Sequence, residues 1–467
     1  MNVFDQKDLD KFALVSGDWN PIHTSPSVAR RLITGEVVVH GILVLLHALN
    51  DFCHFNIQTL ASVKCRFLKP IFLKTEIDIG VTSITKYDAR ITVTSNSMAC
   101  LSIIVTFGGV KNVDMPAQGE YFKTSPADHK FEDLKDSAGI AAIHFNLPYM
   151  EDRFPHLISK IGILPTQSLM LCSKIVGNDC PGLNSLFSGL DVTFEAGSLL
   201  KEVSWNVQRH TSPIAPIKIA VSGGGLSGHL EAFYRPSAVK QTSIEAISEN
   251  VNIGDFKNQR ALVIGASRGL GELTAKIIAS GGGKVVGTFY GGQDDADRLV
   301  NEIGLSGDKF KMVHLNILNN DPGYLKCFLE SVFVPTHVYY FASPRIKSNK
   351  DNQLNHDLLD TYRLFFVKSF SNFVESSRDT WSDNIVIMYP STVFIDEDMP
   401  EFKEYVSAKL QGEKLYPKRD DQDNIQVFYK RLPRMKTDQT SGILAAKVAD
   451  NFEVMYKLIK ELSVIHE

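Results

Sequence analysis

Along the first part of this 467-residue chain, one long apolar segment precedes several shorter ones. Residues 37–52 (VVVHGILVLLHALNDF) stay apolar over several helical turns, which predicts a buried helix. Runs rich in β-branched and aromatic residues follow without a helix between them, at residues 62–72, 76–84, 90–96 and 99–109. This order predicts an α+β domain over residues 1–110, in which the helix packs on an antiparallel sheet.

The same order of elements returns more faintly over residues 145–245. Residues 156–176 predict a second apolar helix. Strand-like runs follow it at residues 185–195, 204–210, 217–223 and 229–236. Such a repeat predicts two similar α+β domains side by side. The residues between them, 111–144, are polar and broken by prolines and a glycine, which predicts a connector.

Over residues 258–467 the pattern changes to strands that alternate with helices. Short apolar strands are predicted at residues 260–266, 284–290, 337–343 and 384–390. Helical segments lie between them, among them 270–280 and 358–377. Alternation of this kind predicts an α/β domain with a doubly wound parallel sheet. We place the boundary between the two kinds of pattern in the polar stretch 237–259.

Composition narrows the classes of protein that fit this organisation. Hydrophobic residues make up 44% and charged residues 22%, and the net charge of -4 gives no reason to expect a nucleic-acid partner. No apolar run is long enough to span a membrane and the N-terminus lacks a secretory signal, so we expect a cytoplasmic protein without a membrane partner. The six cysteines form no CxxC and no Cys/His cluster, so we expect no metal site and no disulfide.

A loop near the start of the chain carries the first candidate chemistry. It reads SGDWNPIH over residues 16–23, and VVHGIL follows at residues 38–43. The carboxylate of Asp18 and the imidazole of His23 can hold one water molecule between them, and hydration of a conjugated thioester needs such an acid and base. Charge that develops on the thioester oxygen needs a donor, and a helix that begins at Gly41 offers an N–H group and the positive end of its dipole.

These two motifs resemble those of the MaoC-like, (R)-specific enoyl-thioester hydratases, a family of hotdog folds, over residues 1–110. The resemblance implies that Asp18 and His23 are the catalytic pair. It also implies that Asn20 orients this pair and that Gly41 is the backbone donor to the thioester oxygen. The expected substrate is therefore an acyl thioester, carried by acyl carrier protein or coenzyme A.

The second repeat, residues 145–245, has no such loop. Its candidate acid–base residues share no spacing that would pair them: His156, Asp191, His210 and His229. The resemblance implies a double hotdog in which the second half replaces a dimer partner and plays a structural role. We interpret His40 and His47 in the same way, as packing or hydrogen-bonded residues of the helix. A homodimer of the whole chain is left open.

A second motif begins in the alternating region. After the predicted strand at 260–266 come Gly265-Ala-Ser-Arg-Gly269-Leu-Gly271 and a helix, the context that a pyrophosphate site requires. Further on, Tyr405 and Lys409 lie four residues apart, on one face of a predicted helix. An ammonium group beside a phenol lowers the pKa of the phenol, which makes Tyr405 a candidate proton donor.

The glycine spacing and the order Ser391, Tyr405, Lys409 resemble those of the short-chain dehydrogenases/reductases, which have a Rossmann-type fold. The resemblance implies that Ser391 holds a carbonyl oxygen, that Tyr405 donates a proton and that Lys409 also binds the nicotinamide ribose. The cofactor-binding residues that it implies are Gly265, Ser267, Arg268, Gly269, Leu270, Gly271, Thr288, Asn316, Ala342, Tyr405 and Lys409.

Charge favours NADP(H) over NAD(H) as the cofactor. The strand at 284–290 ends near Thr288 without the acidic residue that would bind a ribose 2′-hydroxyl. Arg268, inside the glycine loop, is a base that could bind a 2′-phosphate. Phe365 stands where the family has an Asn, and this departure keeps open a non-catalytic, nucleotide-binding scaffold.

The sequence therefore predicts an α+β double hotdog followed by an α/β Rossmann-type domain. The two activities share a 3-hydroxyacyl thioester, so we expect a bifunctional 3-oxoacyl-thioester reductase and (R)-3-hydroxyacyl-thioester dehydratase in fatty-acid or polyketide-type biosynthesis. Two alternatives remain open. One is a degradative enoyl-CoA hydratase and 3-hydroxyacyl-CoA dehydrogenase, which NAD dependence would favour. The other is a hydratase fused to a scaffold.

Overall fold

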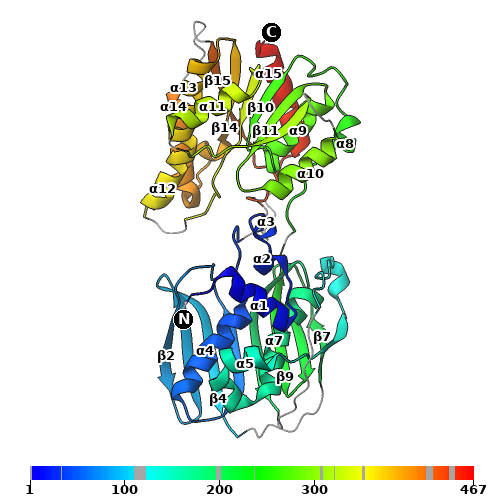
Figure 1. Ribbon diagram of the computed structural model, residues 1–467, viewed down its shortest axis with the longest axis vertical. Coiled ribbons are helices and arrows are strands. Elements are labelled where there is room, and N and C mark those ends of the chain that lie inside the picture. Colours follow the sequence, from blue (N-terminus) through cyan, green and yellow to red (C-terminus); the bar gives the residue numbers. More distant parts are fainter. Residues whose placement is uncertain are drawn as a thin grey trace. The chain divides into compact units, whose positions relative to one another are not determined.

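Two separate units make up the structure, a computed structural model shown in Figure 1. It describes residues 3–32, 34–109, 122–195, 201–235, 237–304, 309–319, 321–349, 353–416, 424–440 and 448–466. Unit 1 is Met1–Ser237 and unit 2 is Ala238–Glu467. The division falls at the beginning of the polar stretch 237–259, whose other residues belong to unit 2.

Unit 1 contains helices and one large sheet. The helices are α1 (Gln6–Ser16), α2 (Pro21–Thr24), α3 (Pro26–Ala29), α4 (Gly41–Phe55), α5 (Leu147–Arg153), α6 (Pro155–Ile161), α7 (Ile163–Lys174), the 3₁₀ turn η1 (Phe131–Leu134) and the π-helical turn η2 (Ile175–Asp179). The strands are β1 (Leu60–Phe67), β2 (Asp78–Ile84), β3 (Asp88–Ser95), β4 (Met98–Phe107), β5 (Ala138–Ala142), β6 (Ser185–Phe194), β7 (Glu202–Arg209), β8 (Ile217–Gly223) and β9 (Leu226–Tyr234).

The sheet of unit 1 is antiparallel, and its two halves have the same strand order, running outward from the middle of the sheet. Its order is β2-β3-β4-β1-β6-β9-β8-β7-β5, so β1 and β6 join two halves that mirror each other. Helices α4 and α7 lie in front of this sheet and contact each other (Figure 1). Burial alternates along β3, because successive side chains point to opposite faces and one face is covered. The predicted helix at 156–176 is divided into α6, α7 and η2.

The segment expected to be a connector, residues 111–144, is not wholly irregular. Residues 111–121 lie outside the described part of the chain. Strand β5, at the other end of the segment, pairs with β7 as the outermost strand of the sheet. Its sequence, AGIAA, is short and apolar but poor in β-branched residues, so the sequence pattern gave no strand signal there.

Unit 2 alternates strands and helices. The strands are β10 (Arg260–Ile264), β11 (Lys284–Phe289), β12 (Phe310–His314), β13 (His337–Tyr340), β14 (Ile385–Thr392) and β15 (Ile425–Leu432). The helical elements are α8 (Ile244–Ser248), α9 (Gly269–Ser280), α10 (Gln293–Ile303), α11 (Pro322–Ser331), α12 (His356–Arg363), the π-helical turn η3 (Leu364–Lys368), α13 (Ser369–Thr380), η4 (Val393–Ile395), η5 (Pro400–Phe402), α14 (Lys403–Leu415) and α15 (Asn451–His466).

The sheet of unit 2 is parallel, with the order β12-β11-β10-β13-β14-β15. The order reverses between β10 and β13, and in such sheets ligands bind beyond the carboxyl ends of the strands at this point. Along β10, Ala261 and Val263 belong to one core cluster and Leu262 and Ile264 to another. Both faces of the strand are thus buried, which explains its unbroken apolar sequence.

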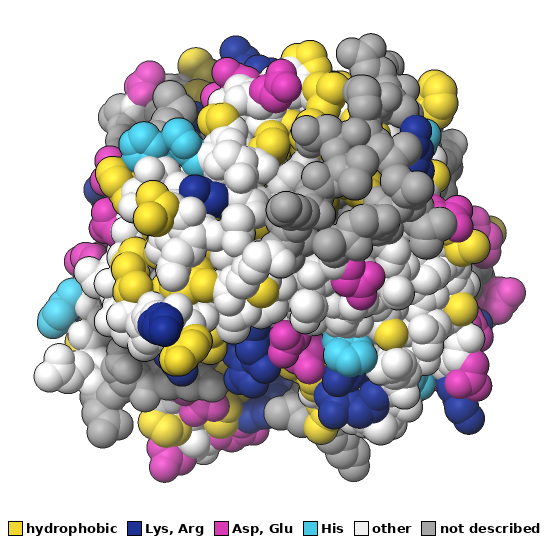
Figure 2. All heavy atoms as spheres, turned by 90° about the horizontal axis from the view of Figure 1, so that it is seen from below, with side chains coloured by type: hydrophobic (Ala, Val, Ile, Leu, Met, Phe, Trp, Pro, Cys, Tyr) yellow, Lys and Arg dark blue, Asp and Glu magenta, His cyan; other side chains and the backbone are white. Residues whose placement is uncertain are grey.

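On the face that Figure 2 shows, basic and acidic side chains are scattered among hydrophobic ones, and several Lys and Arg lie near Asp or Glu. One example on the sheet of unit 1 is the pair of Lys64 on β1 and Asp191 on β6, whose Nζ and Oδ2 atoms are 2.8 Å apart. Within the described ranges, none of the helices has both the length and the apolar character needed to cross a membrane.

Candidate active sites

The loop that carries Asp18 and His23 is built by local sequence. Helix α1 ends at Gly17, whose φ of 79° is left-handed and whose N–H donates to Ala13. Pro21 is the first residue of α2, where its missing N–H costs nothing. The two ends of this short loop therefore hold Asp18 and His23 at the positions where the chain leaves α1 and enters α2.

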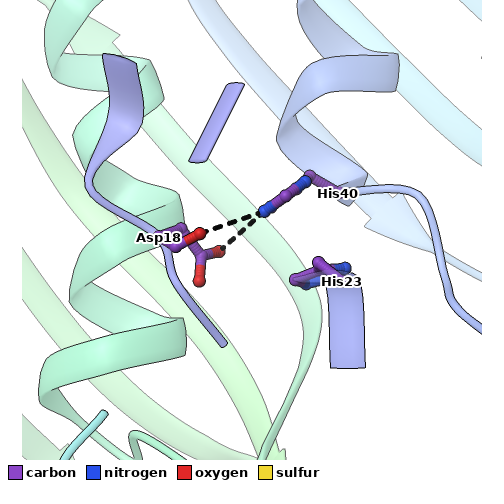
Figure 3. A group of neighbouring side chains, drawn as sticks. All are labelled: Asp18, His23 and His40. Carbon is purple, nitrogen blue, oxygen red and sulfur yellow. Dashed lines mark hydrogen bonds and ion pairs between the residues drawn. The ribbon is translucent and has the colours of Figure 1, made fainter. Parts of the chain in front are cut away.

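The structure brings Asp18 and His23 together with a third side chain, His40 (Figure 3). The ligand-type atoms of the three lie within 4.8 Å of one another. Asp18 and His40 are buried, and His23 is half-buried. His23 Nδ1 lies 2.6 Å from the carbonyl oxygen of Val38, to which it donates. In the neutral ring Nε2 then carries the lone pair, so it can accept a proton.

His40, at the start of helix α4, is both hydrogen-bonded and packed against another ring. Its Nε2 lies 3.3 Å from the backbone oxygen of Asp18 and 3.9 Å from Oδ2 of the same residue. Its ring stacks on His23, with centroids 3.9 Å apart and planes 25° apart. His47, which lies within helix α4, contacts Phe4 instead. The sequence gave the two histidines the same role, and their neighbours give them different ones.

The carboxylate of Asp18 is held by the second repeat. Ser173 of helix α7 donates its hydroxyl to Asp18 Oδ2 at 2.7 Å, and both side chains are buried. A Cβ atom at Gly177 in η2 would lie 2.2 Å from Asp18 Oδ1, so only glycine leaves room for the carboxylate. Sequence reasoning missed Ser173 and Gly177, because more than 150 residues separate them from Asp18 and no local spacing relates them.

Asn20 anchors the same loop to the second repeat. Its Nδ2 donates to the backbone oxygens of Gly177 at 2.9 Å and Gly182 at 3.1 Å. Its Oδ1 accepts from Ile22 N–H and so caps α2. The neighbouring Trp19 also donates to the second repeat, from its backbone N–H to Asn178 Oδ1 at 2.9 Å. The second repeat thus fixes the loop along its whole length.

Gly41 is the first residue of helix α4, where backbone N–H groups have no partner within the helix. A Cβ atom here would lie 2.9 Å from the Phe67 ring, so the position requires glycine for space. The geometry is compatible with the donor role that the sequence suggested.

Burial shifts the pKa values of the Asp18 carboxyl and the His23 imidazole towards each other. It raises the pKa of the Asp18 carboxyl, against the opposing effects of His23, the Ser173 hydroxyl and the Asn20 amide. It lowers the pKa of the His23 imidazole, against the opposing effects of the Asp18 carboxylate and the Val38 carbonyl. Proton affinities that converge in this way suit a pair that exchanges one proton during a reaction.

The three side chains are not arranged as metal ligands, although their atoms are close together. The lone pair of an imidazole lies in the plane of its ring, and the His23 and His40 rings are stacked. Stacked rings direct their lone pairs nearly parallel, whereas a zinc ion needs two imidazole nitrogens to converge at about 2.0–2.1 Å. The expectation of no metal site stays a prediction.

In unit 2 the glycine loop joins β10 to α9 at the reversal of the strand order. A Cβ at Gly271 would lie 2.2 Å from the Gly265 oxygen, so the helix packs directly on the loop. Gly265 in turn abuts Ala342, which follows β13. Gly269 has a φ of 63° and open space around its Cβ position. Ser267 is buried, and Leu270 packs on the core below the loop.

Other residues implied in cofactor binding already have protein partners. Arg268, the N-cap of α9, lies 3.5 Å from Asp438 Oδ2 through its Nη1. The hydroxyl of Thr288 accepts the N–H of Gly265 at 3.0 Å, which ties the loop to β11. The side-chain oxygen of Asn316 accepts the N–H of Leu318 at 3.1 Å and closes a turn.

Tyr405 and Lys409 share one face of α14 as expected, and both are buried. Lys409 donates to the carbonyl oxygen of Pro390, and its Nζ lies 3.9 Å from the centre of the Phe366 ring and 5.9 Å from that of Tyr405. Burial lowers the pKa of the Lys409 ammonium to about 7, against the opposing charge of Glu413. Phe365, which stands where the family has an Asn, lies in the π-helical turn η3.

Ser391, which the resemblance assigns to a substrate carbonyl oxygen, bonds to a carboxylate of the protein in this structure. Its hydroxyl donates to Glu413 Oε1 at 2.5 Å, and Glu413 also accepts from Arg431 of β15 at 2.7 Å. The next residue, Thr392, is the one whose side chain hydrogen-bonds Tyr405. Neighbouring residues of a strand point to opposite faces, so a shift of one position changes which hydroxyl meets the tyrosine.

The expected lowering of the pKa of Tyr405 is wrong in this structure. Burial raises that pKa well above the ordinary value for a phenol, and the hydrogen bond with Thr392 opposes the rise only in part. Lys409 donates its hydrogen bond to the Pro390 oxygen and lies against the Phe366 ring, and its Nζ is 5.9 Å from the centre of the Tyr405 ring.

Comparison with known proteins finds a family match in the segment of unit 1 that carries the first site. Residues 2–98 match a family model described as "MaoC like domain". The resemblance seen in the sequence is confirmed there, and Asp18, His23 and His40 all lie in the matched segment. Over 76 residues the chain is 34% identical to the mitochondrial 3-hydroxyacyl-(acyl-carrier-protein) dehydratase of Arabidopsis thaliana. This match covers 16% of the chain and 46% of that relative, so the chain spans about half the relative's length.

Solved structures similar to parts of the chain include BdcA in complex with NADPH, at 16% identity and a TM-score of 0.39, over 45% of this chain and 88% of that one. A dehydrogenase/reductase from Sinorhizobium meliloti has 16% identity and a TM-score of 0.39, over 47% and 91% of the two chains. A short chain dehydrogenase from Burkholderia cenocepacia in complex with NADP has 17% identity and a TM-score of 0.39, over 44% and 90%. The family match itself covers residues 2–98, which resemble the MaoC-like domain.

Proposed function

We propose that unit 1 catalyses the reversible hydration of a trans-2-enoyl thioester to an (R)-3-hydroxyacyl thioester. The observation that carries the proposal is the buried loop on which Asp18 and His23 face each other, inside the segment that matches the MaoC-like domain. Buried acid–base pairs with shifted pKa values are typical of catalytic sites. An acyl thioester is also the substrate class named for the Arabidopsis relative.

In this proposal Asp18 and His23 hold one water molecule and one mobile proton. For hydration, one member of the pair takes a proton from water as its oxygen bonds to the β-carbon, and the other delivers a proton to the α-carbon. Dehydration reverses both transfers, so the reaction needs no redox partner. The N–H of Gly41, at the start of helix α4, would stabilise the charge on the thioester oxygen.

We further propose that unit 1 is a double hotdog with one working site. Its two mirrored half-sheets, each with a buried helix, support this reading. The second half would supply the support for the reacting loop, through Ser173, Gly177 and Asn178, in place of a partner subunit.

The direct test is hydration of a crotonyl-type thioester by the wild-type chain and by Asp18→Asn and His23→Ala. Loss of a positioned acid or base lowers a rate by about 10²- to 10⁴-fold. Both variants should keep the wild-type melting temperature of unit 2, because the substitutions lie in the other unit. Undiminished hydration in both variants would reject the site.

A second activity is proposed for unit 2, the reduction of a 3-oxoacyl thioester with NADP(H). A specific observation favours it: the glycine loop stands at the reversal of a parallel sheet, and Tyr405 and Lys409 are buried together on α14. The residues fit a dinucleotide, since the first turn of the 12-residue helix α9 offers N–H groups beside Gly269, where space is open.

NADPH, when bound, would supply the hydride for this reduction. Arg268 would bind the 2′-phosphate in competition with Asp438, and Lys409 would hold the ribose. Tyr405 would donate the proton to the carbonyl oxygen, with Thr392 as its hydroxyl partner. The product, a 3-hydroxyacyl thioester, is the substrate for dehydration in unit 1, which is why we favour a biosynthetic direction.

A coupled assay separates this proposal from its alternatives. With a 3-oxoacyl thioester and NADPH, the wild-type chain should consume NADPH and release trans-2-enoyl product, measured by mass spectrometry of the thioesters on both carriers. A preference for NAD(H) would favour the degradative direction. Hydration without any consumption of NADPH or NADH would favour a scaffold role for unit 2.

A further inference from the structure

His40 touches both members of the proposed catalytic pair in unit 1. Its imidazole is fully buried at the start of α4, and it stacks on His23 with ring centroids 3.9 Å apart. Its Nε2 lies 3.3 Å from the backbone oxygen of Asp18 (Figure 3). The other side of the ring is packed against Phe12, with centroids 4.9 Å apart. The ring is therefore clamped in one orientation.

The surroundings of His40 fix its charge and tautomer. A carbonyl oxygen only accepts, so Nε2 must carry the hydrogen that bonds to Asp18. The other ring nitrogen, Nδ1, has no hydrogen-bond partner among the described residues. Protonation would leave a buried N–H unpaired, which is costly. Burial and the neighbouring His23 accordingly lower the pKa of His40 well below its ordinary value. These surroundings favour the neutral form of His40.

We propose that His40 is a positioning residue for the hydration assigned above: its ring fixes the plane of His23 by stacking and the backbone of Asp18 by a hydrogen bond. The inference rests on the proposed function of unit 1. The hydrogen bond from His23 Nδ1 to Val38 fixes one point of the His23 ring but leaves rotation about that contact. The stacked ring removes this freedom. Misplacement of a reacting group by about 1 Å costs on the order of 100-fold in rate.

A neutral positioning ring leaves the charge of the site to other groups. Those that act on the pair besides each other are Arg235, which disfavours protonated His23, and Asp179, which disfavours ionised Asp18. Phe12, on the other face of His40, is uncharged. Exchange of His40 for another neutral ring therefore tests geometry and local polarity without removal of a charge.

The experiment compares three variants in the hydration assay at several pH values. His40→Leu loses the stack and the donor, His40→Phe keeps a ring but loses the donor, and His47→Leu is the control on the same helix. We expect kcat of His40→Leu to fall about 10- to 100-fold with KM within about twofold, because the pair is misaligned while substrate contacts remain. His40→Phe should lose less, and His47→Leu should stay within about twofold of wild type.

The pH profile distinguishes positioning from packing. A phenyl face attracts an imidazolium ion, so His40→Phe should move the limb that reports His23 to higher pH. A purely structural role would lower the amount of folded protein and leave the limbs in place, which circular dichroism of each sample corrects for. If His40→Leu does not fold, His40→Phe carries the test.

Two results would overturn the inference, and they are distinguishable. If Asp18→Asn abolishes hydration while folded His40→Leu and His40→Phe keep the wild-type kcat and pH profile, His40 has no positioning role. If Asp18→Asn and His23→Ala both hydrate at the wild-type rate, the assignment of the site to Asp18 and His23 fails, and the role of His40 fails with it.

Discussion

Each unit carries a sequence motif, but the motif residues lie close to each other in unit 1, whereas in unit 2 one of them bonds to residues outside the motif. In unit 1, Asp18 and His23 come from one loop of six residues and face each other, because a capped turn leaves few ways to arrange them. In unit 2, Ser391 comes from a strand and Tyr405 and Lys409 from a helix. There Ser391 pairs with Glu413 and Arg431, residues outside the motif.

This difference teaches that spacing determines a site only where the chain between the residues is short and regular. The i,i+4 relation of Tyr405 and Lys409 survives in the structure, since both belong to one helix. The relation between strand and helix depends on packing, and one residue of shift along β14 exchanges Ser391 for Thr392 as the neighbour of Tyr405.

The first prediction concerns the tyrosine of unit 2 and its partner hydroxyl. Tyr405→Phe should lower NADPH-dependent reduction of a 3-oxoacyl thioester by about 10²- to 10⁴-fold, because it removes the proton donor. Thr392→Val should cost more activity than Ser391→Ala, since Thr392 contacts Tyr405 and Ser391 contacts Glu413. Steady-state rates of the three variants decide this, and the reverse order would restore Ser391 to the site.

Gly177→Ala should abolish most of the hydration activity of unit 1. The added Cβ would stand 2.2 Å from Asp18 Oδ1, so the carboxylate must move by an ångström or more. We expect a loss on the order of 100-fold in kcat. The matched control is Gly80→Ala, where nothing lies within 4 Å of the Cβ position. Equal rates for the two variants would contradict the close approach of Asp18 and η2.

Ser173→Ala should lower hydration about tenfold and move its pH profile to higher pH. The Ser173 hydroxyl donates to the Asp18 carboxylate and so holds its pKa down against burial. Without that bond the pair releases its proton at higher pH, and hydrogen bonds to charged groups contribute about 1.5–3 kcal/mol.

The control for this prediction is Ser168→Ala, on the same helix, whose hydroxyl bonds to Gly224 at 2.7 Å and not to the loop. It should shift the melting temperature without any shift of the pH profile. If the pH profiles of Ser173→Ala and Ser168→Ala shifted equally, helix α7 would affect hydration only through the stability of unit 1.

The smallest effect is expected for cofactor selection in unit 2. Arg268→Ala should reduce the preference for NADPH over NADH by a few-fold to about tenfold, because an Arg–phosphate contact is charge-assisted. The ion pair with Asp438, at 3.5 Å, competes with the phosphate, so Asp438→Asn should strengthen NADPH binding. Isothermal titration measures both, and equal affinities in the wild type would argue for the degradative direction.

The pattern of apolar and polar residues predicted much of the secondary structure. The buried helix at α4, the strands β1 to β4 and the alternating strands β10, β11, β13 and β14 were predicted within a few residues. The pattern did not reveal β5, which is poor in β-branched residues, or β12 and β15, whose apolar residues are interrupted by lysines. All three lie at an edge of their sheet within the described residues.

The sequence by itself determined the local geometry of the first site and the order of elements in both units. Asp18, Asn20 and His23 are close in the chain, and a cap and a proline leave the loop little freedom. Only the tertiary structure decided that Ser173 and Gly177 hold this loop, that His40 stacks on His23, and that Ser391 turns to Glu413. These contacts join residues from different elements, and packing of a whole unit, which no local spacing encodes, sets the distances between them.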